Sequence, residues 1–172
     1  MKLPEFCETL TNKLQQTPAE ERLEMASLAL QQAFKVAEDE VAFLVLNEEL
    51  QTLNFVWPKR LIKAGSIPVK TRDSLAAETV RNALPQINNR FTSTQHASIF
   101  ELVKLNTGKQ ADSQRPSTIQ KVMSAPLLAG DTLVGVVQVS RKAEDANLAG
   151  PDFTEPELEA LSGIARVIGS HL

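Results

Sequence analysis

The side chains best suited to bind a metal ion or to act as nucleophiles are few and widely spaced in this chain. The two histidines are His96 and His171, and the single cysteine is Cys7. Structural zinc sites use four cysteine or histidine ligands with short spacings, so these three residues predict no metal site. The serines lack the G-x-S-x-G pattern that exposes a nucleophile on a sharp turn. A single cysteine excludes an intramolecular disulfide, which fits a reducing compartment.

Two further patterns resemble catalytic motifs only in spacing. Gly130 and Gly135 are separated by four residues, as in a phosphate-binding loop, but Val136 follows where that loop requires lysine. Glu155 and Glu157 stand at the start of an expected helix, where carboxylates face solvent and favour the helix N-terminus. The sequence therefore predicts no catalytic residues and a protein that is not an enzyme.

Composition narrows the classes of partner. The chain has 172 residues and a net charge of −3, from 18 basic and 21 acidic side chains. This balance gives no general attraction to nucleic-acid phosphates or to anionic lipids. No apolar run reaches the length of a membrane span, and charges interrupt the N-terminus where a signal peptide is apolar. We therefore expect a soluble, cytoplasmic protein that binds neither nucleic acid nor membrane.

Helices are expected at the N-terminus, over residues 1–38. An apolar stripe at spacings of three and four predicts the first helix, formed by Leu3, Phe6, Leu10 and Leu14. For the second helix, Thr17 with Glu20 three residues later predicts a capping box, and Pro18 fits the first turn.

The middle of the chain predicts strands and a short helix. Residues 40–47 are apolar on both faces, which is typical of a central strand, and residues 53–58 form its hairpin partner. The basic segment 59–72 is expected to be a solvated loop. A helix is expected over 75–84, capped by Ser74 or Asp73, with a short strand near Ile87. Residues 96–105 fit a helix by spacing, although their β-branched content also allows a strand, and residues 106–117 are expected to be a surface loop.

The strongest pattern is the hairpin over residues 123–142. Gly130 and Asp131 fit a two-residue type II′ turn, because glycine accepts the positive φ of the first position. Gly135, inside the second strand, indicates close approach by another backbone or by a ligand. An acidic loop follows, and then a helix with a capping box formed by Thr154 and Glu157.

This C-terminal pattern resembles that of the GAF domain family, and the resemblance extends over about residues 20–172. The matching residues are Pro126, Leu127, Gly130, Leu133, Gly135, Phe153, Glu157 and Leu161. The resemblance implies an α+β fold with an antiparallel sheet of about five or six strands. N- and C-terminal helices would cover one face, and shorter helices and loops would enclose a pocket on the other. Residues 1–172 would then form one GAF-like domain, with terminal helices in 1–38 and the sheet, pocket elements and last helix in 39–172.

Family membership implies a sensor or regulatory domain that binds a small molecule, without identifying that molecule or any cofactor. The alternative is a protein-interaction or dimerisation module whose own side chains fill the pocket. The resemblance places the helix 75–84 and the segment around 90–103 over the sheet. The polar and aromatic residues near those elements are the expected ligand-binding residues, namely Trp57, Arg81, Asn82, His96, Phe100 and Gln138.

Departures from individual subfamilies limit the choice of ligand. Cys7 is the only cysteine to which a tetrapyrrole could attach, and its place in an apolar stripe favours a structural thiol. Members that reduce free methionine sulfoxide need several cysteines, so that activity is excluded. Ser140 and Leu158 break the pattern of cyclic-nucleotide-binding members. In that pattern Arg141 and Glu157 remain, and we expect them to form a structural charge pair.

The terminal helices predict a homodimer, because their apolar faces are wider than one packing surface requires. Two apolar stripes run along these helices: Leu23, Ala26, Leu30, Ala33 and Ala37 in the second, and Leu158, Leu161, Ala165, Ile168 and Leu172 in the last. Met25 and Leu28 widen the first stripe, and Ile164 and Val167 widen the second. No output domain is visible in the sequence, so the signal would pass either to a separate partner protein or to a segment beyond these residues.

Overall fold

A six-stranded antiparallel sheet forms the centre of the computed structural model, which describes residues 2–93 and 117–172. The strand order is β3-β2-β1-β6-β5-β4. The strands are β1 (Val41–Asn47), β2 (Thr52–Trp57), β3 (Ser66–Pro68), β4 (Gln86–Asn88), β5 (Thr118–Ala129) and β6 (Thr132–Ala143). This arrangement confirms the α+β fold expected from the sequence.

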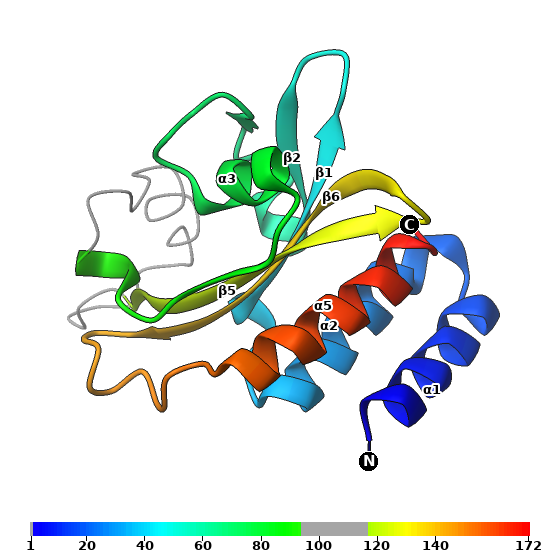
Figure 1. Cartoon of the computed structure of the whole chain (residues 1–172), viewed down its shortest axis with the longest axis horizontal. Coiled ribbons are helices and arrows are strands. Elements are labelled where there is room, and N and C mark those ends of the chain that lie inside the picture. Colours follow the sequence, from blue (N-terminus) through cyan, green and yellow to red (C-terminus); the bar gives the residue numbers. More distant parts are fainter. Residues whose placement is uncertain (1, 94–116) are drawn as a thin grey trace.

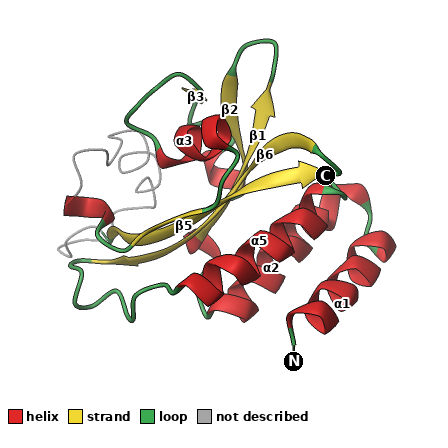
Figure 2. Ribbon diagram, viewed as in Figure 1, coloured by secondary structure: helices red, strands yellow, loops and turns green. Residues whose placement is uncertain are grey.

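Helices cover the sheet unequally on its two faces (Figures 1 and 2). On one face lie α1 (Leu3–Gln16), α2 (Arg22–Phe34) and α5 (Glu155–Gly169). On the other lies the short helix α3 (Leu75–Asn82). Four 3₁₀ turns are also present in the described residues, at Ala19–Glu21 (η1), Glu38–Glu40 (η2), Lys59–Leu61 (η3) and Phe91–Ser93 (η4).

Each face of the sheet has its own apolar core. The larger core joins the sheet to α1, α2 and α5, and includes Leu30, Phe43, Val137 and Leu161. The smaller core lies beneath α3 and includes residues of β1, β2, β5 and β6. Strand β1 was expected to be apolar on both faces. Its side chains are indeed divided between the two cores.

The hairpin of β5 and β6 is confirmed. Ala129 pairs with Thr132, so Gly130 and Asp131 form the two-residue turn, and Gly130 alone of these two has a positive φ, of 62°. This matches the backbone that a type II′ turn requires at its first position. Within β6, a β-carbon on Gly135 would overlap the backbone of Leu44 in β1, so the close approach predicted at this glycine is made by the neighbouring strand.

The start of α2 differs from the prediction. Thr17 does not cap α2. Its hydroxyl donates to the Lys13 carbonyl oxygen at 2.7 Å and its N–H to the Leu14 carbonyl oxygen at 3.3 Å, so Thr17 ends α1. The chain then passes through η1, and α2 begins at Arg22. Lys35, at φ 54°, ends α2 at Phe34, so the stripe predicted to reach Ala37 stops before it.

Three other segments can be compared with expectation. The basic segment 59–72 was expected to be a loop but contains η3 and the edge strand β3, which pairs with β2. The helix expected over 75–84 ends at Asn82, because Ala83 is left-handed at φ 51°. The helix predicted over 96–105 and the loop predicted over 106–117, apart from Ser117, lie outside the described residues.

The last helix, α5, begins at a capping box and ends against the sheet. At its start, the predicted capping box is present: the Thr154 N–H donates to Glu157 Oε2 at 2.8 Å, and the Glu157 N–H donates to the Thr154 hydroxyl at 3.4 Å. At its end, the space beside Gly169 is filled by the backbone of Leu128, whose nitrogen would lie 2.6 Å from an added β-carbon. Along its outer side α5 is covered by α1, whose Leu3 lies against Gly163. The extra apolar width of α5 is therefore used at least partly within the chain.

Among the helices of the described part of the chain, none combines the length and the apolar character needed to cross a lipid bilayer.

Candidate functional site

Helix α3 covers the sheet face on which the family resemblance places a pocket. The helix begins at Ser74, whose side-chain oxygen accepts a hydrogen bond from the Ala77 N–H at 3.2 Å. This cap satisfies one of the free N–H groups of the first turn. Ala76 and Ala77 are buried, and their small side chains let α3 pack closely onto β5 and β6.

A polar contact joins α3 to the sheet within this apolar face. The Thr79 hydroxyl of α3 lies 2.8 Å from the Ser124 hydroxyl of β5 and 2.9 Å from the Leu75 carbonyl oxygen. Both side chains are fully buried. Because buried hydroxyls are costly unless they are hydrogen-bonded, this pair fixes where α3 sits on β5.

Gln138 lies beside this pair. It is the cross-strand partner of Ser124 in the β5–β6 hairpin and of Ala42 in β1. Gln138 is 4% exposed, and its amide nitrogen Nε2 has no hydrogen-bond partner among residues 2–93 and 117–172. A buried donor without a partner costs about 1–3 kcal/mol. The sheet face beneath α3 therefore presents one unsatisfied donor in apolar surroundings.

The surroundings of Gln138 are mostly apolar. Val122, Val136 and Val80 are buried on the same face, and Thr79 and Ser124 are the polar groups beside them. Small-ligand sites have this composition, mostly apolar with a few placed polar groups. The described residues contain no cluster of histidine, cysteine or carboxylate side chains that would suit a metal ion.

Of the other expected ligand-binding residues, the structure describes Arg81, Asn82 and Trp57. Arg81 belongs to α3, but its guanidinium donates to the carbonyl oxygens of Val69 and Thr71 and so ties the preceding loop to the helix. Asn82 is exposed at the end of α3. His96 and Phe100 lie outside the described residues.

Trp57 lies on the other face of the sheet. It is 5% exposed and belongs to the core formed with α2 and α5. The structure therefore separates Trp57 from Gln138, with which the sequence interpretation had grouped it.

Arg141 and Glu157 lie close to each other at the start of α5. Arg141 Nη2 is 3.7 Å from Glu157 Oε1, and the guanidinium stands 4.5 Å from the centre of the Phe153 ring. Asn89 completes this junction, because its Nδ2 donates to the Phe153 carbonyl oxygen and its Oδ1 accepts from the Phe153 N–H, both at 2.9 Å. These contacts join β6, β4 and the N-terminus of α5.

Sequence reasoning missed several buried polar residues. A sequence signal does mark Ser124, which is a polar residue within the otherwise apolar stretch 122–128 and pairs with Gln138 across the hairpin. No local signal marks Lys121, which is buried in β5 and pairs with Asp152 at 2.6 Å across a loop. Its partner is distant in sequence, so only the fold brings the two charges together.

The fold has close structural relatives. At 12% identity and a TM-score of 0.70, the chain is similar to the GAF domain of a phosphoenolpyruvate-protein phosphotransferase from Acinetobacter, over 97% of this chain and 90% of that one. A methyl-accepting chemotaxis protein (residues 122 to 287) matches at 12% identity and a TM-score of 0.67, over 94% and 93% of the two chains. A free methionine-R-sulfoxide reductase from Neisseria meningitidis matches at 14% identity and a TM-score of 0.61, over 98% and 84%.

Sequence comparison agrees with this structural likeness. Among curated proteins, none matches the chain. The model of the GAF domain, however, matches residues 20–172, which include the whole sheet, α3 and α5. The chain therefore belongs to the GAF domain family.

Proposed function

We propose that this GAF domain is a non-catalytic sensor that binds a small molecule beneath α3, with Gln138 as the polar contact. The observation that carries the proposal is the buried, unpartnered Nε2 of Gln138. A hydrogen-bond acceptor on a ligand would remove the cost of this unsatisfied donor. GAF domains are commonly sensory or regulatory domains, and one structural neighbour is part of a chemotaxis protein.

A regulatory role is favoured over an enzymatic one by the available side chains. One neighbour is a methionine sulfoxide reductase, but this chain has a single cysteine, Cys7, where that chemistry needs several. Cys7 lies on α1 against the helical core, and burial raises the pKa of its thiol. A raised pKa lowers the fraction of reactive thiolate. We further propose that the protein acts in the cytoplasm and that residues 1–172 form a single domain, with α1 packed on α5.

The experiment uses native mass spectrometry on protein purified without denaturation. The expected result is an excess mass over the denatured chain, present in the wild-type protein and absent from Gln138→Met. Since methionine removes the unsatisfied donor without creating a large cavity, Gln138→Met should also unfold at a higher temperature when ligand-free. Gln32→Met, an exposed change on α2, is the control and should keep the ligand.

Two results would contradict the proposal. If Gln138→Met retained the same mass as wild type, Gln138 would not contact the ligand. If the wild-type protein neither carried a ligand nor took one up from a cell extract, the domain would act without a small molecule.

The second candidate function is a dimerisation module that signals to a partner protein, and one exposed residue favours it. Leu28 of α2 is 46% exposed, whereas Ala26 and Leu30 beside it are buried in the chain's own core. An exposed leucine on a helix that packs on the sheet offers an apolar surface for the α2 helix of a second copy. We propose a homodimer through α2, compatible with ligand binding beneath α3.

A further inference from the structure

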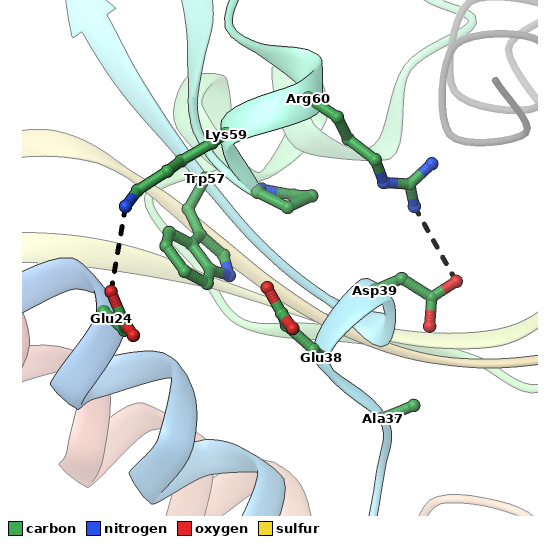
Figure 3. Close-up of a pocket in the computed structure, with 8 residues that line it drawn as sticks. Glu24, Ala37, Glu38, Asp39, Trp57, Lys59 and Arg60 are labelled. Carbon is green, nitrogen blue, oxygen red and sulfur yellow. Dashed lines mark ion pairs between the residues drawn. The ribbon is translucent and has the colours of Figure 1, made fainter. Parts of the chain in front are cut away.

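A cavity lies beside α2, on the opposite face of the sheet from Gln138 (Figure 3). Its volume is about 560 Å³, and it opens between the two 3₁₀ turns η2 and η3. Trp57 and Pro58 supply its apolar lining, and charged side chains of α2, η2 and η3 supply the rest. Neither the family match nor the proposed sensor site accounts for this cavity.

Trp57 brings an unsatisfied donor to this cavity. The residue is 5% exposed, and its indole Nε1 has no hydrogen-bond partner among the residues that the structure describes. Figure 3 shows the nitrogen-bearing edge of the ring turned toward the carboxylate of Glu38. Buried tryptophan N–H groups usually have a partner, so this one is available to an acceptor on a bound molecule.

Two carboxylates around the cavity are already paired. Glu24 Oε2 lies 3.8 Å from Lys59 Nζ. Asp39 Oδ2 lies 3.7 Å from Arg60 Nη2 and 3.0 Å from Lys142 Nζ. These ion pairs are drawn in part in Figure 3.

Glu38 is different. Its carboxylate has no ion pair or side-chain hydrogen bond with another residue in the described part of the chain. Glu40, the next acid of η2, accepts hydrogen bonds from the backbone N–H groups of Ala37 and Lys142. Four carboxylates thus stand among three cations, and the unmatched negative charge is the one that faces the tryptophan.

We propose that this cavity binds a small organic ammonium compound that also carries an oxygen acceptor, such as an amino alcohol. The ammonium group would lie against the Trp57 ring and pair with Glu38, since a cation is attracted both by the face of an indole and by a carboxylate. The oxygen of the ligand would accept from Nε1. Lys59 and Arg60 remain engaged by Glu24 and Asp39, so they leave the cavity selective for a cation.

Tryptophan fluorescence tests the proposal directly, because the chain has one tryptophan and no tyrosine. Choline is the probe, and its uncharged isostere 3,3-dimethyl-1-butanol is the control, at constant ionic strength. The expected result is a saturable change in Trp57 emission with choline and none with the alcohol. In a ¹⁵N-labelled sample, the single indole N–H resonance should move as its acceptor binds.

Matched variants assign the effect to Glu38. Glu38→Gln should weaken choline binding by about tenfold or more, since it removes the charge and keeps the shape. Glu49→Gln, an exposed change in the β1–β2 turn, should leave the binding unchanged. The proposal is overturned if choline gives no saturable change, if the alcohol binds equally well, or if Glu38→Gln binds as tightly as wild type. Each of these outcomes leaves the ligand site at Gln138 unaffected.

Discussion

Gly135 of β6 lies so close to Leu44 of β1 that a β-carbon at position 135 would overlap the Leu44 carbonyl oxygen. The Val45 Cα would lie only 3.1 Å from the same added β-carbon. Both neighbours are backbone atoms of a central strand, which cannot move aside as the end of a flexible side chain can. Any side chain at position 135 must therefore displace β1 from β6.

Gly135→Val is expected to destabilise the protein by about 1–3 kcal/mol or more, because the added side chain overpacks the strand pair. Urea unfolding followed by circular dichroism measures the loss. Gly130→Asn is the control, since nothing lies within 4 Å of position 130 and asparagine tolerates its φ of +62°. Equal losses for the two variants would show that the contact with Leu44 is unimportant.

Two glycines of α5 should respond in opposite ways to alanine. Gly169→Ala should destabilise by about 1–3 kcal/mol, because the new methyl group would lie 2.6 Å from the backbone nitrogen of Leu128. At Gly163 the three atoms nearest to an added β-carbon all belong to the flexible Leu3 side chain, the first at 3.3 Å. There the higher helix propensity of alanine should stabilise by up to about 1 kcal/mol. Thermal unfolding of both variants checks the sign, and a stabilising Gly169→Ala would contradict the packing described for the end of α5.

Lys142 should make stability depend on alkaline pH. Burial lowers the pKa of Lys142, and this effect outweighs its hydrogen bond to Asp39. Between the lowered folded pKa and the ordinary value of 10.5, the unfolded chain binds more protons, so stability rises with pH across that window. The cost of burying the charge is fully present below the folded pKa.

Lys142→Met removes that titration and keeps an apolar stem of similar length. Its unfolding free energy relative to wild type should be most favourable near neutral pH and should decline as the pH approaches 10.5. Urea unfolding at several pH values measures both proteins. A difference that stays constant over the whole window would show that Lys142 does not titrate differently in the folded state.

Leu28→Glu should convert the proposed homodimer to a monomer without loss of fold. Leu28 is 46% exposed, so the charge would be solvated in the monomer but buried at the α2 interface of a dimer. Sedimentation velocity at micromolar concentration measures the change, and circular dichroism checks the fold. Val167→Glu is less specific, because Val167 packs against the chain's own core. A wild-type protein that stays monomeric at high concentration would remove the dimer proposal.

Features that depend on neighbouring residues could be predicted from the sequence. The turn at Gly130 and the capping box of Thr154 and Glu157 are decided within a few residues, and both are present. Thr17 shows the limit of such reasoning. A threonine beside proline fits the start of one helix or the end of another, and the hydrogen bond from its hydroxyl to Lys13 determines the outcome.

The candidate site was only partly predictable. Alternating side chains along a strand define its two faces, but they do not indicate which helix covers each face. Gln138 lies on the sheet face beneath α3, since its cross-strand neighbour Ser124 contacts that helix. Trp57 lies at the end of β2. Before it, the register of the β1–β2 pairing shifts, at the step between Phe43 and Leu44 of β1. Its face depends on that long-range register, which no local pattern specifies.

The attachment of α5 at both ends has a mechanical consequence. Near its start, Arg141 of β6 contacts both Phe153 and Glu157, and at its end Gly169 abuts Leu128 of β5. The two attachment points lie at opposite ends of the same long hairpin. Because both ends of α5 contact this hairpin and α1 packs on α5, we expect a bend of β6 at Gln138 to shift α5 and to move α1 with it.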